Sequence, residues 1–375
     1  MNSASRLVAV SAVCAFALHT GSVFAVNRTS VDPATGIATV VFDEVGDFTW
    51  RAPVSQQVEL LVVGGGGGGG CGVAGGGGGG GQVYHSTTFS VTGGMTYSVT
   101  VGAGGAGGTN GGSSVGRWHG ENGGDSVFGA ITCLGGGGGG GHAGTAVRTG
   151  VAGGNSGGAS KVNSSYTSPD ATGTDDAANG WYGGHKGGNS KKATPGPGVV
   201  LYSGGGGGAM GEGGIGYYDA DAGYCHSGNG GDGYVCDITG AAVYYACGGG
   251  GGAEGKDSSG YTIYLIGGDG GSGNASGGAG PKAHHEFGSK GTDGTGTGGG
   301  GGGWNTSSPT VGGNGGSGIV VLRYAATAPV VELVPTSGYL GIDELGVSVN
   351  VIYPEKLPLP MRHLLPGRGA RRLFP

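Results

Sequence analysis

Short β-strands combined with packed polyglycine segments, in a mostly β fold with long loops and little α-helix, are the structure that this sequence predicts. Three observations predict it. Glycine supplies 103 of the 375 residues, and much of it stands in uninterrupted blocks. Hydrophobic residues make up 36% of the chain and gather in short runs between those blocks. No segment shows the sustained 3.6-residue apolar period that an amphipathic helix needs.

The first residues, 1–25, are expected to be a cleaved signal peptide. Arg6 precedes an apolar stretch over 7–18, and Val23-Phe24-Ala25 supplies small residues where a signal peptidase cleaves. A membrane anchor is the alternative, but the stretch is shorter than the roughly 20 residues that cross a bilayer. We therefore expect a secreted, extracellular or cell-surface protein without a membrane span.

The glycine-rich body is predicted to span residues 26–324. Period-two apolar patterns predict strands at 37–42, 58–63, 82–91, 96–101 and 318–324. Thr92-Gly93-Gly94 supplies a turn, so the strands at 82–91 and 96–101 are expected to pair as a β-hairpin. On the first of these strands, one face is expected to carry Val83, His85, Thr87, Phe89 and Val91.

Glycine blocks at 64–70, 75–81, 135–141 and 298–303 need a structure of their own. A run of glycines makes neither a stable α-helix nor a good strand, because it has no side chains to pack and loses the most entropy on ordering. Left-handed helices of the polyproline-II type have no internal hydrogen bonds and, without Cβ atoms, can lie side by side. We expect this polyglycine-II-like packing; mobile loops between strands are the alternative.

Two further segments follow the body. Residues 325–353 contain strand-like runs at 330–334 and 347–352, and are expected to form part of an appended β-domain. Residues 354–375 are rich in Pro and Arg and are expected to be a disordered tail. A basic anchor to an acidic surface and an incomplete or frame-altered end of a longer protein are alternative interpretations of this tail.

The cysteines are interpreted as those of an exported chain. Once Cys14 leaves with the signal peptide, an odd number remains, so at least one thiol is expected to be free or bonded between chains. The disulfide candidates are Cys71, Cys133, Cys225, Cys236 and Cys247. The last three are evenly spaced, which predicts at least one disulfide among them. Glycosylation sequons begin at Asn27, Asn163, Asn274 and Asn305, and matter only in a secretory pathway that glycosylates.

No pattern predicts catalysis, a cofactor or a metal. The glycine run after Val63 satisfies G-x-G-x-x-G, but no helix begins at its end. Zinc at the cysteines near His226 would lack the usual C-x-x-C spacing, and His284-His285 has no spaced partner. The net charge of −6 gives no basic surface for nucleic acid. We therefore expect a protein that is not an enzyme and binds no nucleic acid.

Aromatic residues between the glycine blocks are the candidate ligand-binding residues. Tyr and Trp on rigid supports provide contact area at low entropy cost. The candidates are Trp118, Trp181, Tyr182 and Trp304, and nearly all of the aromatics between the glycine blocks are expected in loops. The alternative is that these rings cap the exposed ends of the glycine layers.

The order of these segments resembles the bacterial glycine-rich domain of exported and surface proteins. The resemblance lies in the strand at 58–63, the paired blocks within 64–81, the segments 82–91 and 97–105, Gly123-Gly-Asp-Ser-Val-Phe128, and the closing 313–324. Weaker likenesses are to the glycine-rich extracellular domain of anaplastic lymphoma kinase-type receptors, through 298–303 and Trp304-Asn305, and to the polyglycine tips of phage tail-fibre adhesins. These relatives imply structural, adhesive or recognition roles.

Together these observations predict a secreted or surface-associated structural or adhesive protein. The alternative is an extracellular module that recognises a glycan or a receptor through aromatic loops. The expected partners are the extracellular matrix and cell-surface glycans or proteins, with self-association or an intermolecular disulfide as further expectations.

Overall fold

The computed structural model describes residues 28–72, 74–109, 118–141, 149–160, 166–193, 198–222, 224–257, 264–271, 287–303 and 311–326. Short strands dominate these residues, and one 3-10 helix, η1, is the single helix among them. The elements are β1 (Arg28–Asp32), β2 (Ile37–Phe42), β3 (Gly46–Arg51), β4 (Gln56–Val63), β5 (Val83–Val91), β6 (Thr96–Val101), β7 (Ser126–Phe128), β8 (Ile131–Cys133), η1 (Ala177–Asn179), β9 (Trp181–Tyr182), β10 (Lys191–Ala193), β11 (Gly198–Tyr202), β12 (Tyr217–Asp219), β13 (Tyr224–His226), β14 (Tyr234–Cys236), β15 (Val243–Tyr245), β16 (Ala253–Asp257), β17 (Tyr264–Ile266) and β18 (Ile319–Ala325).

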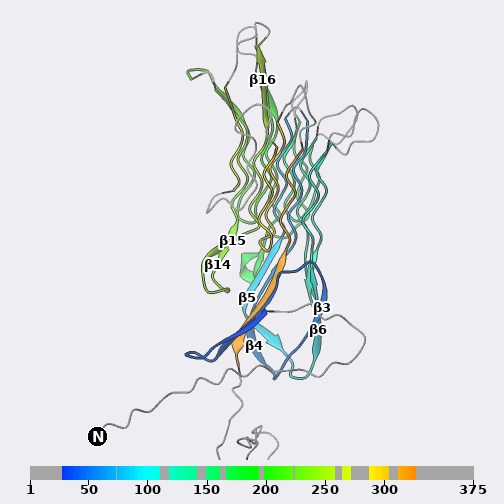
Figure 1. The fold of residues 1–375 in the computed structure, drawn as a ribbon, viewed down its shortest axis with the longest axis vertical. Helices are drawn as coiled ribbons and strands as arrows, with labels where there is room; N and C mark the ends of the chain where they lie inside the picture. Colours follow the sequence, from blue (N-terminus) through cyan, green and yellow to red (C-terminus); the bar gives the residue numbers. More distant parts are fainter. Residues whose placement is uncertain are drawn as a thin grey trace, which may run out of the picture.

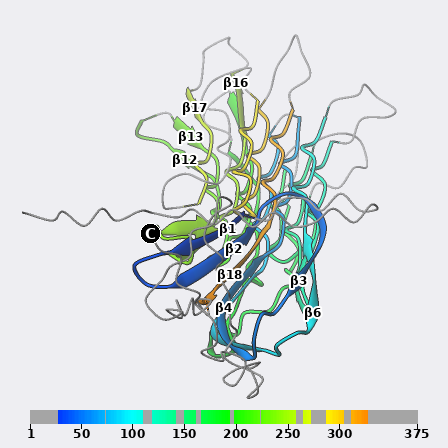
Figure 2. The same ribbon diagram turned by 60° about the horizontal axis from the view of Figure 1, so that its bottom comes forward.

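The largest sheet has six strands in the order β1-β2-β18-β4-β5-β9, all antiparallel to their neighbours. A four-stranded antiparallel sheet, β3-β6-β7-β8, lies beside it (Figure 2). The two sheets pack around a core that includes Phe42, Leu60, Trp50 and Phe128. The fold is therefore mostly β, built from short antiparallel strands in several sheets, as predicted.

Strand β4 is buried on both faces, which explains its unbroken apolar run. Val58, Leu60 and Val62 contribute to the core against the four-stranded sheet. Leu61 and Val63 belong to a second core on the other face, which the hairpin β14–β15 covers. A strand between two cores needs apolar residues at successive positions rather than at alternate ones.

The predicted hairpin between the strands at 82–91 and 96–101 is wrong. Strand β5 pairs with β4 and β9, whereas β6 pairs with β3 and β7 in the facing sheet. The turn at 92–95 crosses between the sheets; within it the Gly94 N–H donates to the Ala52 carbonyl oxygen, and the Met95 carbonyl oxygen accepts from the Ala52 N–H. A Gly-Gly turn permits either connection, so the apolar faces decide which strands pair.

The predicted single face of β5 is wrong as well. Its ladder with β4 shifts register between Val58 and Leu60, where a β-bulge interrupts the pairing. An extra residue reverses the alternation of side chains along a strand. Val83 consequently packs in the second core and Val91 in the first, although both have odd numbers.

Beyond the sheets, the glycine segments run side by side along the long axis of the molecule (Figure 1). The amide N–H groups of residues 65–70 donate to three segments in turn, and the partner repeats at every third residue. These three acceptor segments are 121–124, 313–316 and 76–79. The carbonyl oxygens of residues 65–70 accept from three other segments, 136–139, 105–108 and 299–302. Every backbone polar group of residues 65–70 is therefore paired.

The neighbouring block at 75–81 has the same environment. Its N–H groups donate to 296–302, 137–140 and 204–207, again with a three-residue repeat. Its carbonyl oxygens accept from 249–252, 67–70 and 155–158. The two blocks together form the centre of what we call the glycine bundle, the set of segments that these hydrogen bonds join.

Close backbone packing explains why the bundle requires glycine. A Cβ atom on Gly67, Gly68 or Gly69 would overlap the carbonyl oxygen of Gly137, Ala106 or Gly300, respectively. Most other glycines of the bundle would meet a backbone carbonyl in the same way. The composition is thus a direct consequence of the spacing between segments. Within the described residues, no helix has the length and apolarity needed to cross a membrane.

Candidate functional site

The predicted ligand-binding aromatics do not form one surface in the described part of the chain. Trp181 and Tyr182 form strand β9 at the edge of the six-stranded sheet rather than a loop. The Trp181 ring lies 4.9 Å from the ring of Tyr84, and Tyr182 stacks on Tyr234 at 4.1 Å. Both rings are therefore used in packing. Trp118 is half-buried, and its carbonyl oxygen accepts a hydrogen bond from Cys71 at the end of the bundle; Trp304 lies outside the described residues.

No disulfide joins the five described cysteines, contrary to the prediction for Cys225, Cys236 and Cys247. All five side chains are buried, and Cys225 and Cys236 belong to different core clusters. Cys225 lies on β13 and Cys236 on β14, so these two side chains point into separate cores, whereas Cys247 follows the end of β15. Burial raises the pKa of the Cys71 and Cys225 thiols to about 12. All four sequon asparagines, Asn27, Asn163, Asn274 and Asn305, lie outside the described residues.

A small polar cavity of about 340 Å³ opens beside the bundle. Its lining includes Asp43, Lys290, Asp293 and Asn314. The charges face one another, since Lys290 and Asp293 form an ion pair at 2.5 Å and Asp293 also accepts from the backbone N–H of Ser317. This cavity offers few charged groups to a ligand.

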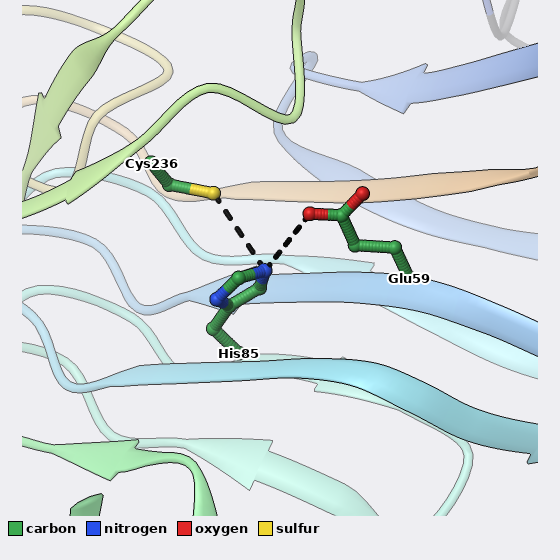
Figure 3. A group of neighbouring side chains, drawn as sticks. All are labelled: Glu59, His85 and Cys236. Carbon is green, nitrogen blue, oxygen red and sulfur yellow. Dashed lines mark hydrogen bonds and ion pairs between the residues drawn. The ribbon is translucent and has the colours of Figure 1, made fainter.

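Among the described residues, Glu59, His85 and Cys236 form a close group of three side chains that could bind a metal (Figure 3). Strand β4 carries Glu59 at the β-bulge, and the adjacent strand β5 carries His85 opposite Leu61. Cys236 ends strand β14, which covers this face of the sheet. The three side chains meet at the border of the second core, where Cys236 is 5% exposed.

The histidine uses one nitrogen for two partners. His85 Nε2 lies 3.1 Å from Glu59 Oε1 and 3.7 Å from Cys236 Sγ. Its other nitrogen, Nδ1, lies 2.8 Å from the hydroxyl oxygen of Tyr234. The side chains of His85 and Glu59 are only 14% and 20% exposed, so the group is largely shielded from water.

Outer contacts fix each member of this group. Glu59 turns its second oxygen, Oε2, toward Arg323 Nη1 at 3.7 Å. Burial raises the pKa of Tyr234, as does its hydrogen bond with Tyr182, so its hydroxyl stays neutral. Burial also raises the pKa of the Cys236 thiol, opposed by hydrogen bonds from the backbone N–H groups of Ile238 and Asp237.

A cysteine-nucleophile relay is not what this geometry provides. Such a relay places the thiol on one imidazole nitrogen and the orienting carboxylate on the other. Here Cys236 and Glu59 both contact Nε2, and Tyr234 occupies Nδ1. A sulfur, an imidazole nitrogen and a carboxylate oxygen around one point are instead the donor atoms that transition metals use.

Sequence reasoning missed this group because its members are far apart in the chain. Cys236 is 151 positions from His85, and no motif spacing connects them. A local signal was present for one member, since Glu59 interrupts the otherwise apolar run at 58–63. That signal marks one unusual position but does not show that β4, β5 and β14 meet there.

A family model described as a glycine-rich domain matches residues 43–325, well over half of the chain. The chain belongs to this glycine-rich domain family. No curated protein matches it.

The glycine-rich domain, as matched, begins after β2. In the structure, however, β2 lies inside the six-stranded sheet, between β1 and β18. All three residues of the Glu59–His85–Cys236 group fall within the matched range. The group is therefore part of the glycine-rich domain itself.

Proposed function

We propose that this chain is an exported or surface-associated structural protein, without catalytic activity, whose glycine bundle acts as a rigid support for adhesion. The observation that carries the proposal is the pairing of residues 65–70 with six neighbouring segments. Backbone hydrogen bonds hold such a framework together. More than a quarter of the residues are glycines, which have no side chain that could take part in catalysis.

The finer structure proposed for the bundle is a set of polyglycine-II-like helices. A helix of three residues per turn presents successive N–H groups in three directions, so that positions i and i+3 point to the same neighbour. The hydrogen bonds of Gly65 and Gly68, both to the segment 121–124, follow this rule. The same repeat in residues 75–81 supports the assignment further.

The number of backbone hydrogen bonds between its segments supports a rigid glycine bundle. A hydrogen bond between backbone groups contributes modestly, about 1 kcal/mol, but an opened bundle leaves buried N–H and C=O groups unpaired at a larger cost. Residues 64–70 and 75–81 are buried along their whole length. Cohesion of this kind resists local opening, which suits a protein that carries load at a surface.

Export and surface partners form the rest of the proposal. The apolar stretch at 7–18 and the small residues before position 26 support cleavage of a signal peptide. The resemblance to glycine-rich domains of bacterial surface proteins supports contact with a matrix, a cell-surface glycan or a cell-surface protein. Within this proposal, copies of the chain also associate with one another.

An alternative is recognition through aromatic residues at the end of the bundle. One observation favours it: the backbone of Trp118 is held by Cys71 while its side chain is only half-buried. A fixed backbone with an accessible indole is suited to stacking on a sugar ring.

The proposal is tested with the secreted chain after expression in a host that processes signal peptides. N-terminal sequencing is expected to begin at Val26. Sedimentation velocity across a concentration range is expected to show self-association, and the chain is expected to fractionate with the cell surface or matrix. A protein that stays monomeric and binds a glycan saturably, with binding lost in Trp118→Ala, would instead support recognition. A protein retained in the cytoplasm contradicts both functions.

A further inference from the structure

Three unlike donor atoms converge between the six-stranded sheet and strand β14. Glu59 Oε1, His85 Nε2 and Cys236 Sγ all lie within 4.8 Å of one another (Figure 3). Ligands of a tetrahedral zinc ion, bound at 2.0–2.3 Å, are separated by about 3.3–3.8 Å. The Nε2–Oε1 and Nε2–Sγ distances of 3.1 Å and 3.7 Å are close to this spacing. We propose that Glu59, His85 and Cys236 form a binding site for a zinc-type divalent cation.

The hydrogen bonds of His85 prepare it as a ligand. Histidine ligands usually hold their second ring nitrogen in a hydrogen bond, which fixes both the tautomer and the ring orientation. Nδ1 of His85 lies 2.8 Å from the Tyr234 hydroxyl. With Nδ1–H donating to that oxygen, the lone pair of Nε2 points toward Glu59 and Cys236. Tyr234 is itself held in place by stacking on Tyr182.

The carboxylate is oriented by a comparable outer contact. Arg323 on β18 lies opposite Glu59 in the ladder, and its guanidinium approaches Oε2 at 3.7 Å. This contact leaves Oε1 facing His85. The sulfur of Cys236 accepts hydrogen bonds from the backbone N–H groups of Ile238 and Asp237. Donors of this kind stabilise a thiolate, which is the form of cysteine that binds metal.

The donor set selects the type of cation. Calcium and magnesium prefer oxygen ligands, whereas sulfur and imidazole nitrogen together favour zinc and its neighbours among the transition metals. On binding, the Cys236 thiol releases its proton to water, and Glu59 and His85 bind through an existing lone pair. The fourth position is open to a water molecule from the exposed side. Because β14 is distant in sequence from β4 and β5, the cation would tie the hairpin β14–β15 to the sheet.

The test uses the secreted chain, stripped with a chelator, and Co²⁺ as a spectroscopic probe. We expect one equivalent of Co²⁺ to give the visible absorption of a tetrahedral site and the near-ultraviolet absorption of a cobalt–thiolate bond. Zn²⁺ should displace it with 1:1 stoichiometry in calorimetry. The variants Cys236→Ser and His85→Gln should weaken binding by about 100-fold or more, and Tyr234→Phe by about 10-fold to 100-fold.

Matched controls are two residues of the same types outside the site. Cys225→Ser and His226→Gln should leave both absorption bands unchanged, because neither side chain belongs to the group. Far-UV circular dichroism shows whether each variant is folded. The cobalt titration of the wild-type chain tests the proposal even if a variant fails to fold. A folded wild-type chain that produces no cobalt–thiolate band would overturn the proposal. A band that persists in folded Cys236→Ser, or disappears in Cys225→Ser, would overturn it too.

Discussion

The carbonyl oxygen of Gly137 occupies the position that a side chain on Gly67 would need. Gly67 is also bonded through its N–H to Gly79 and through its carbonyl to Gly299. The residue is therefore enclosed by backbone in several directions. Neither partner can move without losing hydrogen bonds of its own.

We expect Gly67→Ala to destabilise the fold by about 3 kcal/mol or more, because a methyl group must separate packed segments and break their hydrogen bonds. Urea unfolding followed by circular dichroism measures the change. Gly211→Ala is the matched control, since its Cβ would meet its nearest atom, the Asp232 nitrogen, at 3.6 Å. This control should change stability by less than about 0.5 kcal/mol. Equal effects of the two substitutions would show that the bundle does not depend on close contact.

Hydrogen exchange should separate the bundle from the exposed turns. Each amide of residues 65–70 donates to a neighbouring segment and is buried. We expect these amides to exchange at least about 1,000-fold more slowly than those of Ala34 and Thr35, in the exposed turn between β1 and β2. The same protection is expected for residues 136, 137, 139 and 140, whose amides also donate within the bundle. Rapid exchange throughout these glycines would mean that the segments are mobile loops.

Because the Trp181 ring packs against other side chains, we expect its removal to destabilise the fold. Its ring contacts Tyr84 and packs against the core between the two large sheets, although it remains half-buried. We expect Trp181→Ala to lower the free energy of unfolding by about 2 kcal/mol. Phe287→Ala is the comparison, because Phe287 is 57% exposed and should contribute little. If Trp181→Ala leaves stability unchanged, the ring is free to serve recognition.

A buried asparagine joins the bundle to a neighbouring loop. Asn155 Nδ2 lies 3.0 Å from the carbonyl oxygens of both Gly80 and Gly81, and Oδ1 accepts from the backbone N–H of His185. Asn155→Asp would place a carboxylate oxygen against two carbonyl oxygens, which raises the folded-state pKa of the new carboxyl above its unfolded value. Stability is then highest at acidic pH and falls as pH rises above about 4.

Unfolding midpoints at pH 4 and pH 7 measure this effect. Asn229→Asp is the control, because Asn229 is exposed and its Oδ1 already acts as an acceptor for the Asp269 N–H. A pH-independent loss in Asn155→Asp would show that the two carbonyl contacts do not matter.

The sheets could be predicted wherever apolar alternation is local. Strands β2, β4, β6 and β18 lie close to their predicted positions because each reads as an apolar run bounded by glycine or polar residues. Which strands pair could not be predicted in the same way. The bulge in β5 reverses its face, and a Gly-Gly turn fits both a hairpin and a crossing between sheets.

The Glu59–His85–Cys236 group shows the same limit more sharply. Its existence depends on a register shift of one residue and on a hairpin that covers the sheet from a distant part of the chain. Spacing rules detect ligands on one turn or one loop. They cannot detect three residues that only tertiary packing brings together.

Buried thiols give the last prediction, a loss of stability at alkaline pH. Burial raises the pKa of Cys71 and Cys225 from 9.0 to about 12. The native state thus keeps protons that the unfolded state releases above pH 9. The contribution of these protonated thiols to the free energy of unfolding is fully present below pH 9. It declines between pH 9 and pH 12 by about 1.4 kcal/mol per pH unit for each thiol.

Urea unfolding at pH 8, 9.5 and 10.5 measures this slope. The double variant Cys71→Ala/Cys225→Ala should lose stability at pH 8 through lost packing but show a shallower decline above pH 9, because two of the titrating groups are gone. Tyr202 supplies part of the remaining slope, since burial raises its pKa as well. At pH 8 the native thiols should resist iodoacetamide and react fully only in denaturant, because the thiolate is the nucleophile. An unchanged slope in the double variant, or rapid alkylation of Cys71 in the native chain, would contradict the burial of these side chains.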